Sequence, residues 1–185
     1  MDYKIIRNEE TKIHSWSGGI SKEIYIYPAN STIDSDFNFR ISTATINPGK
    51  YNFSDFSGYK RLLILLTGEL NLTINNDITH LLPYSHIFFN GDTRVISNTN
   101  FESIDFNLIY KENIDILNFK FIENNFNGEK EYNFGIHIYY NLESPKHIHL
   151  NNNEYTLAVG DTFIACGNNF QIEGVGTGIY INLKI

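Results

Sequence analysis

Three segments of the sequence place charged or amide side chains within otherwise apolar stretches. Arg40 opens the segment RISTA, Arg61 opens RLLILL, and Asp105 and Asn107 alternate with apolar residues in DFNL. An unpaired polar group buried in apolar surroundings carries a large free-energy penalty. These side chains must therefore either face water or meet one another.

Strand geometry would bring the same groups together. Successive side chains of a strand point to opposite faces, so Arg40 and Ser42 would share one face, as would Asp105 and Asn107. We expect them to converge with Arg61 inside a barrel, where Asp105 neutralises one arginine. The other arginine would remain available to an anion, because a guanidinium fork matches a carboxylate with two hydrogen bonds. The pattern predicts a site for a small carboxylate ligand, and Glu23 and Trp16 could line or cover its mouth.

Other interpretations of these residues remain open. Arg40, Asp105 and Arg61 could form an ion-pair network that only ties strands together. Asp105 and Glu23 could form a carboxylate pair for acid–base catalysis, although we expect the neighbouring arginines to keep both ionised. Trp16 could be a core residue instead of a lid.

A second candidate site contains histidines. His147 and His149 are two residues apart, so they would share a strand face and could chelate a divalent ion. Glu154 follows within an Asn-rich turn, and no histidine follows His149. Because this set offers only three ligands, one of them on a turn, we expect no metal and no other cofactor. A metal-dependent isomerase or dioxygenase that uses His147 and His149 is kept as the alternative.

Composition and charge narrow the class of protein. The chain has 185 residues, a formal net charge of −7 and a pI near 5.3. Negative charge repels phosphate backbones, so we expect no nucleic-acid partner. No apolar run approaches membrane-spanning length, and the single cysteine, Cys166, fits a reducing compartment. We therefore expect a cytoplasmic protein without a membrane partner, in which Cys166, within the apolar segment TFIAC, is buried and inert.

Short runs rich in β-branched and aromatic residues, bounded by Gly, Asn, Pro or Asp, predict strands along the whole chain. The predicted ranges are 22–27, 39–46, 61–66, 70–74, 79–82, 87–90, 103–110, 117–121, 134–140, 146–150, 155–159, 162–166 and 178–183. No long stretch repeats apolar residues at helical spacing. Many short strands at close spacing predict an all-β sandwich or barrel.

Two segments have the pattern of the same hairpin. LTINNDIT (72–79) and IHLNNNEYT (148–156) each contain a strand, an Asn-rich turn and a strand, and a Gly-Asp pair follows each of them. This weak repeat of roughly 75 to 80 residues predicts two related halves. We place their boundary at the polar stretch 123–131 (ENNFNGEKE). The halves are then residues 1–122 and 123–185, packed together as one unit.

Motifs in the first 110 residues resemble a known family. They are, in chain order, WSGG (16–19), SKEI (21–24), FRISTA (39–44), FSDFSGYKR (53–61), FNGD (89–92) and DFNL (105–108). In order and spacing they resemble the HutD/Ves family, whose members are associated with histidine utilisation or carry a stress-induced label. The resemblance implies a bicupin fold, with two RmlC-like jelly-roll barrels in one chain, and a binding or regulatory protein without an established reaction.

These observations lead to one expected function with open alternatives. We expect a metal-free, non-catalytic bicupin that binds a small anionic metabolite and modulates histidine or amino-acid catabolism or a stress response. The family context suggests urocanate or a glutamate derivative. A structural or partner-binding module is the further alternative, and a homodimer through edge strands is also considered. The expected ligand-binding residues are Arg40, Ser42, Arg61, Asp105, Asn107, Glu23 and Trp16.

Overall fold

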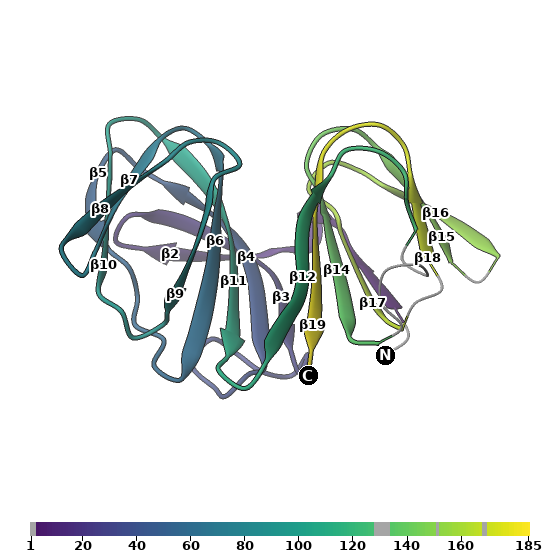
Figure 1. Ribbon diagram of the computed structural model, residues 1–185, viewed down its shortest axis with the longest axis horizontal. Coiled ribbons are helices and arrows are strands. Elements are labelled where there is room, and N and C mark those ends of the chain that lie inside the picture. The colour runs from purple at the N-terminus through teal and green to yellow at the C-terminus, as the bar shows by residue number, and fades with distance from the viewer. Residues whose placement is uncertain (1–2, 128–133, 151, 168–169) are drawn as a thin grey trace. The chain divides into compact units, whose positions relative to one another are not determined.

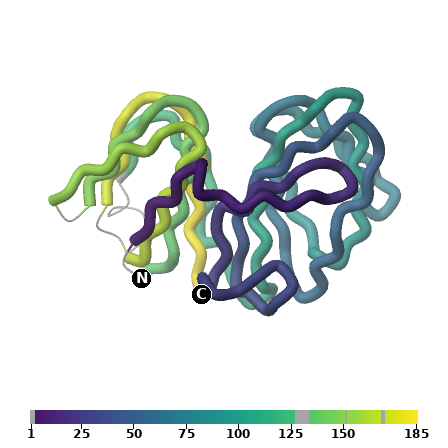
Figure 2. The backbone as a smooth tube through the Cα atoms, turned by 180° about the vertical axis from the view of Figure 1, so that it is seen from behind, coloured from purple at the N-terminus to yellow at the C-terminus, as the bar shows by residue number. Residues whose placement is uncertain are grey.

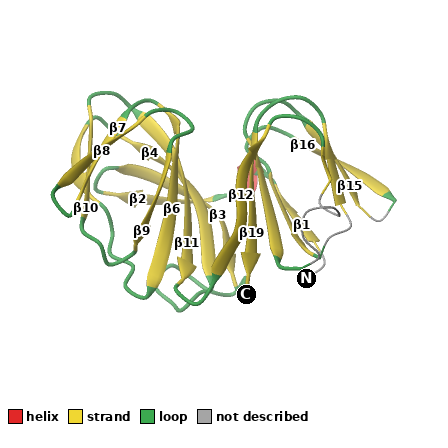
Figure 3. Cartoon of the chain, viewed as in Figure 1, coloured by secondary structure: helices red, strands yellow, loops and turns green. Residues whose placement is uncertain are grey.

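The computed structural model describes residues 3–127, 134–150, 152–167 and 170–185. The described residues form strands and one short 3₁₀ helix, η1 (Asn8–Glu10), so the chain is all-β, as predicted (Figures 1 and 3). Within these ranges no helix has the length and apolar character needed to cross a membrane. The chain divides into two compact units: unit 1 contains residues 1–10 and 113–185, and unit 2 contains residues 11–112.

Unit 2 contains two antiparallel sheets. Its strands are β2 (Lys12–Trp16), β3 (Gly19–Tyr27), β4 (Phe39–Ile46), β5 (Gly49–Asn52), β6 (Tyr59–Thr67), β7 (Leu70–Ile74), β8 (Asp77–Leu81), β9 (His86–Asn90), β10 (Val95–Thr99) and β11 (Ser103–Lys111). One sheet has the order β2-β3-β4-β11-β6-β9 and the other β5-β10-β7-β8. Buried side chains from both sheets, including Ile46, Leu63 and Leu72, pack into one core cluster. The core of unit 2 therefore lies between its two sheets.

Unit 1 is built in the same way. Its strands are β1 (Tyr3–Ile6), β12 (Asp115–Ile122), β13 (Phe126–Asn127), β14 (Ile136–Asn141), β15 (Lys146–Leu150), β16 (Asn153–Leu157), β17 (Thr162–Cys166), β18 (Phe170–Glu173) and β19 (Gly178–Lys184). The sheets have the orders β1-β17-β14-β19-β12 and β13-β18-β15-β16. Tyr139, Phe163 and Phe170 are among the buried residues of its core.

The strand orders reveal a duplication. The sheet β5-β10-β7-β8 of unit 2 corresponds strand for strand to β13-β18-β15-β16 of unit 1, and β4-β11-β6-β9 corresponds to β12-β19-β14-β17. The two Asn-rich hairpins of the sequence are the pairs β7–β8 and β15–β16. The weak sequence repeat therefore reflects two copies of one double-sheet, jelly-roll arrangement.

The two units differ from the predicted halves 1–122 and 123–185. β12 pairs with β19, so the chain enters unit 1 at residue 113, before the polar stretch 123–131. β1 pairs with β17, so the first residues of the chain also belong to unit 1. Figure 2 shows this N-terminal segment, coloured purple, running beside strands from the C-terminal part of the sequence. Part of the predicted boundary, residues 128–131, lies outside the described residues.

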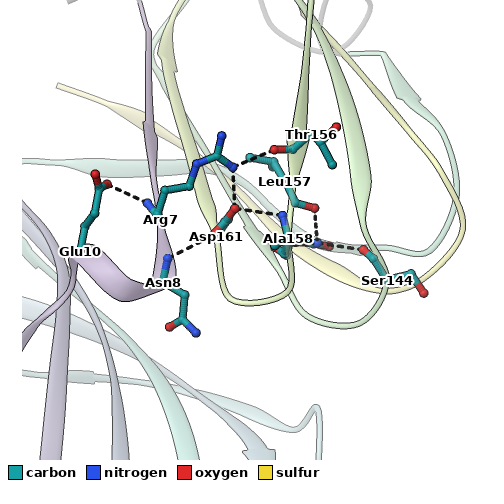
Figure 4. A network of polar contacts seen from close by, with 9 residues as sticks. Arg7, Asn8, Glu10, Ser144, Thr156, Leu157, Ala158 and Asp161 are labelled. Atoms are coloured by element: carbon teal, nitrogen blue, oxygen red, sulfur yellow. Dashed lines mark hydrogen bonds and ion pairs between the residues drawn. The ribbon is translucent and has the colours of Figure 1, made fainter.

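A buried carboxylate fastens the N-terminal segment to unit 1 (Figure 4). Asp161 accepts hydrogen bonds from Arg7 Nη1 at 2.7 Å and from the backbone N–H groups of Asn8 at 3.0 Å and Ala158 at 2.9 Å. The Asp161 side chain is only 2% exposed. Hydrogen bonds to an ionised group are stronger than those between neutral groups. The beginning of the chain thus contributes both a strand and a cation to unit 1.

The expected burial of Cys166 is wrong. The residue is exposed, because it is the last residue of β17 and is followed directly by the turn at Gly167. The apolar segment TFIAC is buried only over its first four residues.

Candidate functional site

The predicted polar residues lie in alternate cross-strand rows of the six-stranded sheet of unit 2. β11 pairs with β4 on one side and with β6 on the other. The rows, each read from β4 through β11 to β6, are Arg40–Ile109–Arg61, Ser42–Asn107–Leu63 and Ala44–Asp105–Leu65. Side chains two positions apart on a strand share a face. The register therefore brings both arginines, the acid, the amide and the hydroxyl to one face of the sheet.

These side chains line a cavity of about 270 Å³ within unit 2. Six of the seven predicted site residues contribute to its lining, namely Trp16, Arg40, Ser42, Arg61, Asp105 and Asn107. Glu23, predicted at the mouth, is buried beside Arg40 and is not among the lining residues. Sequence reasoning missed His14 and the aromatic residues Phe53 and Phe56, which complete the wall.

Arg40 is neutralised by Glu23. Arg40 Nε donates to Glu23 Oε2 at 2.8 Å, and the two side chains are 4% and 6% exposed. A direct pair of Arg40 with Asp105, as considered for a structural ion-pair network, does not form, because Arg40 lies opposite Ile109 whereas Asp105 lies opposite Ala44. At the usual rise of a strand, these positions are about 13 Å apart along the sheet.

Arg61 is packed among aromatic rings. Its guanidinium carbon lies 5.1, 5.7 and 5.0 Å from the ring centroids of Phe53, Phe56 and Phe89. Nη2 donates to Asn107 Oδ1 at 3.0 Å, whereas Nε is buried without a hydrogen-bond partner. Burial lowers the pKa of Arg61 to about 10, so the side chain stays cationic at neutral pH. The cavity therefore contains a charged donor with unused hydrogen-bonding capacity.

Asp105 is joined to Arg61 through an amide. Asn107 Nδ2 donates to Asp105 Oδ1 at 2.5 Å, while the other end of the amide accepts from Arg61. Burial raises the pKa of Asp105 to about 7, against the lowering effects of the Arg61 charge and of hydrogen bonds from Ala44 and Asn107. The expectation that the arginines keep Asp105 fully ionised is therefore wrong, because the effect of burial on this acid, which is only 2% exposed, exceeds that of the Arg61 charge.

The hairpin of β2 and β3 contributes Trp16 and His14 to the cavity wall. The Trp16 ring packs edge-on against Tyr51 and Phe53, with centroids 6.0 Å away in both cases. A Cβ atom at Gly18 would lie 2.3 Å from the Trp16 ring, so close packing explains this glycine. The indole Nε1 is buried without a hydrogen-bond partner. Trp16 therefore packs against the core, and its indole N–H is a hydrogen-bond donor without a partner.

The two histidines of the predicted metal site, His147 and His149, have separate partners. His147 Nδ1 lies 2.8 Å from Glu154 Oε1, and His149 Nε2 lies 3.4 Å from Glu173 Oε2. In the part of the chain that the structure describes, no three His, Cys, Asp or Glu side chains are grouped so that they could hold a metal ion. The geometry therefore gives no support to the metal-dependent alternative built on His147, His149 and Glu154.

The family model described as HutD matches residues 8–180 of the sequence. The chain belongs to the HutD family. The motifs of the first 110 residues thus predicted the HutD family correctly. Among curated proteins there is no match.

Solved structures share the HutD fold of this chain. A conserved protein of unknown function from Pseudomonas aeruginosa PAO1 is 20% identical, with 100% of both chains covered and a TM-score of 0.87. HutD from Pseudomonas fluorescens SBW25, in a structure labelled "Formate condition", is 22% identical, with 98% of both chains covered and a TM-score of 0.80. A Cupin 2 conserved barrel domain protein from Leptotrichia buccalis is 10% identical over 98% of this chain and 96% of that one, with a TM-score of 0.62. These likenesses establish a cupin-type barrel fold.

Proposed function

We propose that this HutD family protein binds a small metabolite bearing a carboxylate in the cavity of unit 2, and that binding modulates histidine or amino-acid catabolism in the cytoplasm. The observation that carries the proposal is the buried Arg61 guanidinium, whose Nε has no hydrogen-bond partner at the cavity. Buried polar groups nearly always have a partner. A carboxylate matches the guanidinium fork in both charge and geometry.

The charges around the cavity favour an anion. Glu23 balances Arg40 in a direct ion pair. Asp105, whose pKa is raised to about 7, balances Arg61 only in part at neutral pH. A bound carboxylate would supply the missing negative charge.

The size and lining of the cavity favour a small ligand. Its volume of about 270 Å³ lies just below the range of roughly 300–1,000 Å³ that is usual for ligand pockets. Phe53 and Phe56 offer apolar surface beside the cation.

Thermal shifts test the proposal. Histidine, urocanate, formylglutamate, glutarate and formate would be added to the wild type, to Arg61→Gln and to Arg94→Gln, in which an exposed arginine of unit 2 is changed. A ligand at ten times its Kd stabilises the folded state by about 1.4 kcal/mol, which raises Tm by a few degrees. We expect such a shift for at least one acid in the wild type and Arg94→Gln, and none in Arg61→Gln. If no acid shifts Tm, or if Arg61→Gln responds like the wild type, the carboxylate site is wrong.

A further inference from the structure

Asp105 is a buried acid at the wall of the proposed anion cavity. Its side chain lies in a residue only 2% exposed, and Asn107 Nδ2 donates to it at 2.5 Å. In the described residues it forms no direct ion pair with either arginine; Arg61 is linked to it through the Asn107 amide. The positive charge of Arg61 therefore acts on Asp105, but the two side chains are not held together in a direct ion pair.

Few charged groups surround Asp105. The charged or titratable side chains at or beside the cavity are Arg61 on β6, Arg40 on β4, Glu23 on β3 and His14 on β2. Arg40 and Glu23 cancel one another in a direct pair. The buried cluster residues facing from the four-stranded sheet are apolar, namely Leu70, Leu72, Leu81 and Val95. The protonation of Asp105 thus depends chiefly on its burial and on Arg61.

We propose that Asp105 is the proton-binding residue of the anion cavity, so that up to about one proton is taken up with each carboxylate bound at Arg61 when Asp105 is ionised in the free protein. This inference rests on the proposed function. A carboxylate at Arg61 brings a second negative charge into a poorly solvated space and competes with Asp105 for the same cation. Like charges in such a space disfavour simultaneous ionisation. The bound anion therefore favours the protonated form of Asp105.

The direction of the pH dependence follows from this coupling. Burial raises the pKa of Asp105 to about 7 in the free protein, and a bound anion raises it further. Below pH 7 the acid already holds its proton, so the affinity for the carboxylate hardly changes with pH. Above pH 7 a proton must be taken up on binding, so Kd increases by up to about tenfold per pH unit. The affinity of the cavity for carboxylates should thus fall from pH 7 to pH 8.5.

Isothermal titration calorimetry with formate and glutarate tests the inference. Both acids are fully ionised above pH 6.5, because ordinary carboxyl pKa values lie near 4. Titrations at pH 6.5, 7.5 and 8.5, each in two buffers of different ionisation enthalpy, give Kd and the number of protons taken up. We expect Kd to increase with pH in the wild type, with uptake approaching about one proton at pH 8.5. In Asp105→Asn, which imitates the protonated acid, we expect binding with a Kd that is independent of pH and no proton uptake.

His14→Gln is the matched control, because His14 also lines the cavity and histidine is a common proton-binding side chain in proteins. The pH dependence should persist in His14→Gln. Binding to the wild type with a constant Kd and no proton uptake would overturn the inference and leave the proposed function intact, as would a pH dependence that His14→Gln removes. If neither acid binds at any pH, the proposed function itself fails. Proton uptake that persists in His14→Gln supports the inference even if Asp105→Asn does not fold, and uptake that His14→Gln abolishes overturns it.

Discussion

Arg40 and Arg61 lie in the same cross-strand row, on either side of Ile109, but their charges are balanced differently. Arg40 donates directly to the carboxylate of Glu23, and both side chains are nearly fully buried. Arg61 reaches a carboxylate only through the amide of Asn107. Of these two arginines, Arg40 is therefore held in a direct ion pair and Arg61 is not, so Arg61 is the one suited to a ligand.

Glu23→Gln should leave Arg40, like Arg61, without a direct ion pair to a carboxylate. The change leaves the buried Arg40 without a counter-charge, and breaking a buried pair in this way costs about 3–5 kcal/mol of unfolding free energy. The same change adds positive charge beside the cavity, so formate should bind more tightly. Urea unfolding and formate titration measure the two effects.

Asp36→Asn is the control for this comparison, because Asp36 forms an exposed ion pair with Lys111 at 2.6 Å. Its loss should have little effect on the unfolding free energy, because solvent screens exposed ion pairs, and should leave formate binding unchanged. A Glu23→Gln protein with wild-type stability and wild-type formate affinity would show that Arg40 does not depend on Glu23.

Alternation along single strands predicted which side chains share a face, but not their partners. Arg40 with Ser42, and Asp105 with Asn107, follow directly from the two-residue period of a strand. The choice of Glu23 as partner depends on the register between β3 and β4, which shifts at a bulge between Glu23 and Tyr25. The local pattern of apolar and polar residues does not predict such a bulge. The raised pKa of Asp105 likewise depends on burial by residues distant in the sequence.

At the scale of elements, most strands with buried faces were predictable, although β10 and β18, which also have a buried face, were missed together with several more exposed strands. The strands without a predicted counterpart are β1, β2, β5, β10, β13 and β18. β1, β2 and β5 are mostly exposed or half-buried, so their sequences lack a continuous apolar pattern. β1 is a strand because it pairs with β17 near the other end of the chain. Missing β2 also hid His14 from the predicted site.

Asp161 should make the attachment of β1 essential for the stability of unit 1. Asp161→Ala removes the acceptor for Arg7 and for the backbone N–H groups of Asn8 and Ala158. Because the two backbone N–H groups lose their acceptor, whereas Arg7 is 40% exposed and can turn to water, we expect a loss of about 1–3 kcal/mol in unfolding free energy for each unsatisfied donor. Urea unfolding gives the magnitude, and hydrogen exchange should show faster exchange in β1 and β17. A loss below about 1 kcal/mol, as for an exposed pair, would mean that strand pairing alone holds β1.

At the scale of the whole molecule, the duplicated fold carries different chemistry in its two copies. In unit 2 the pair β6 and β11 holds Arg61, Asp105 and Asn107. In unit 1 the corresponding pair, β14 and β19, holds His137, Tyr180 and Asn182. His137 Nδ1 lies 2.7 Å from the Tyr180 hydroxyl, and burial lowers the pKa of His137 to about 4. The cluster of unit 1 is therefore neutral at pH 7, so the case for an anion site applies to unit 2 only.

Asp105 of unit 2 and His137 of unit 1 should change the free energy of unfolding in opposite directions as the pH falls from 7 to 5. His137 has a lowered pKa, so the unfolded chain binds its proton first and the stability contributed by neutral His137 is lost on acidification. Asp105 has a raised pKa, so the folded protein binds its proton first and acidification adds stability. Each effect amounts to at most about 1.4 kcal/mol per pH unit.

Two variants separate these contributions. The double variant His137→Phe with Tyr180→Phe removes both hydrogen-bonding partners together, which limits the cost of an unpaired group. Relative to the wild type, it should lose less stability between pH 7 and pH 5, whereas Asp105→Asn should lose more. Urea unfolding at both pH values measures the difference, and all other titrating groups cancel because they are common to the three proteins. Changes of the same sign in both variants would contradict the assignment of a neutral histidine to unit 1 and a proton-binding acid to unit 2.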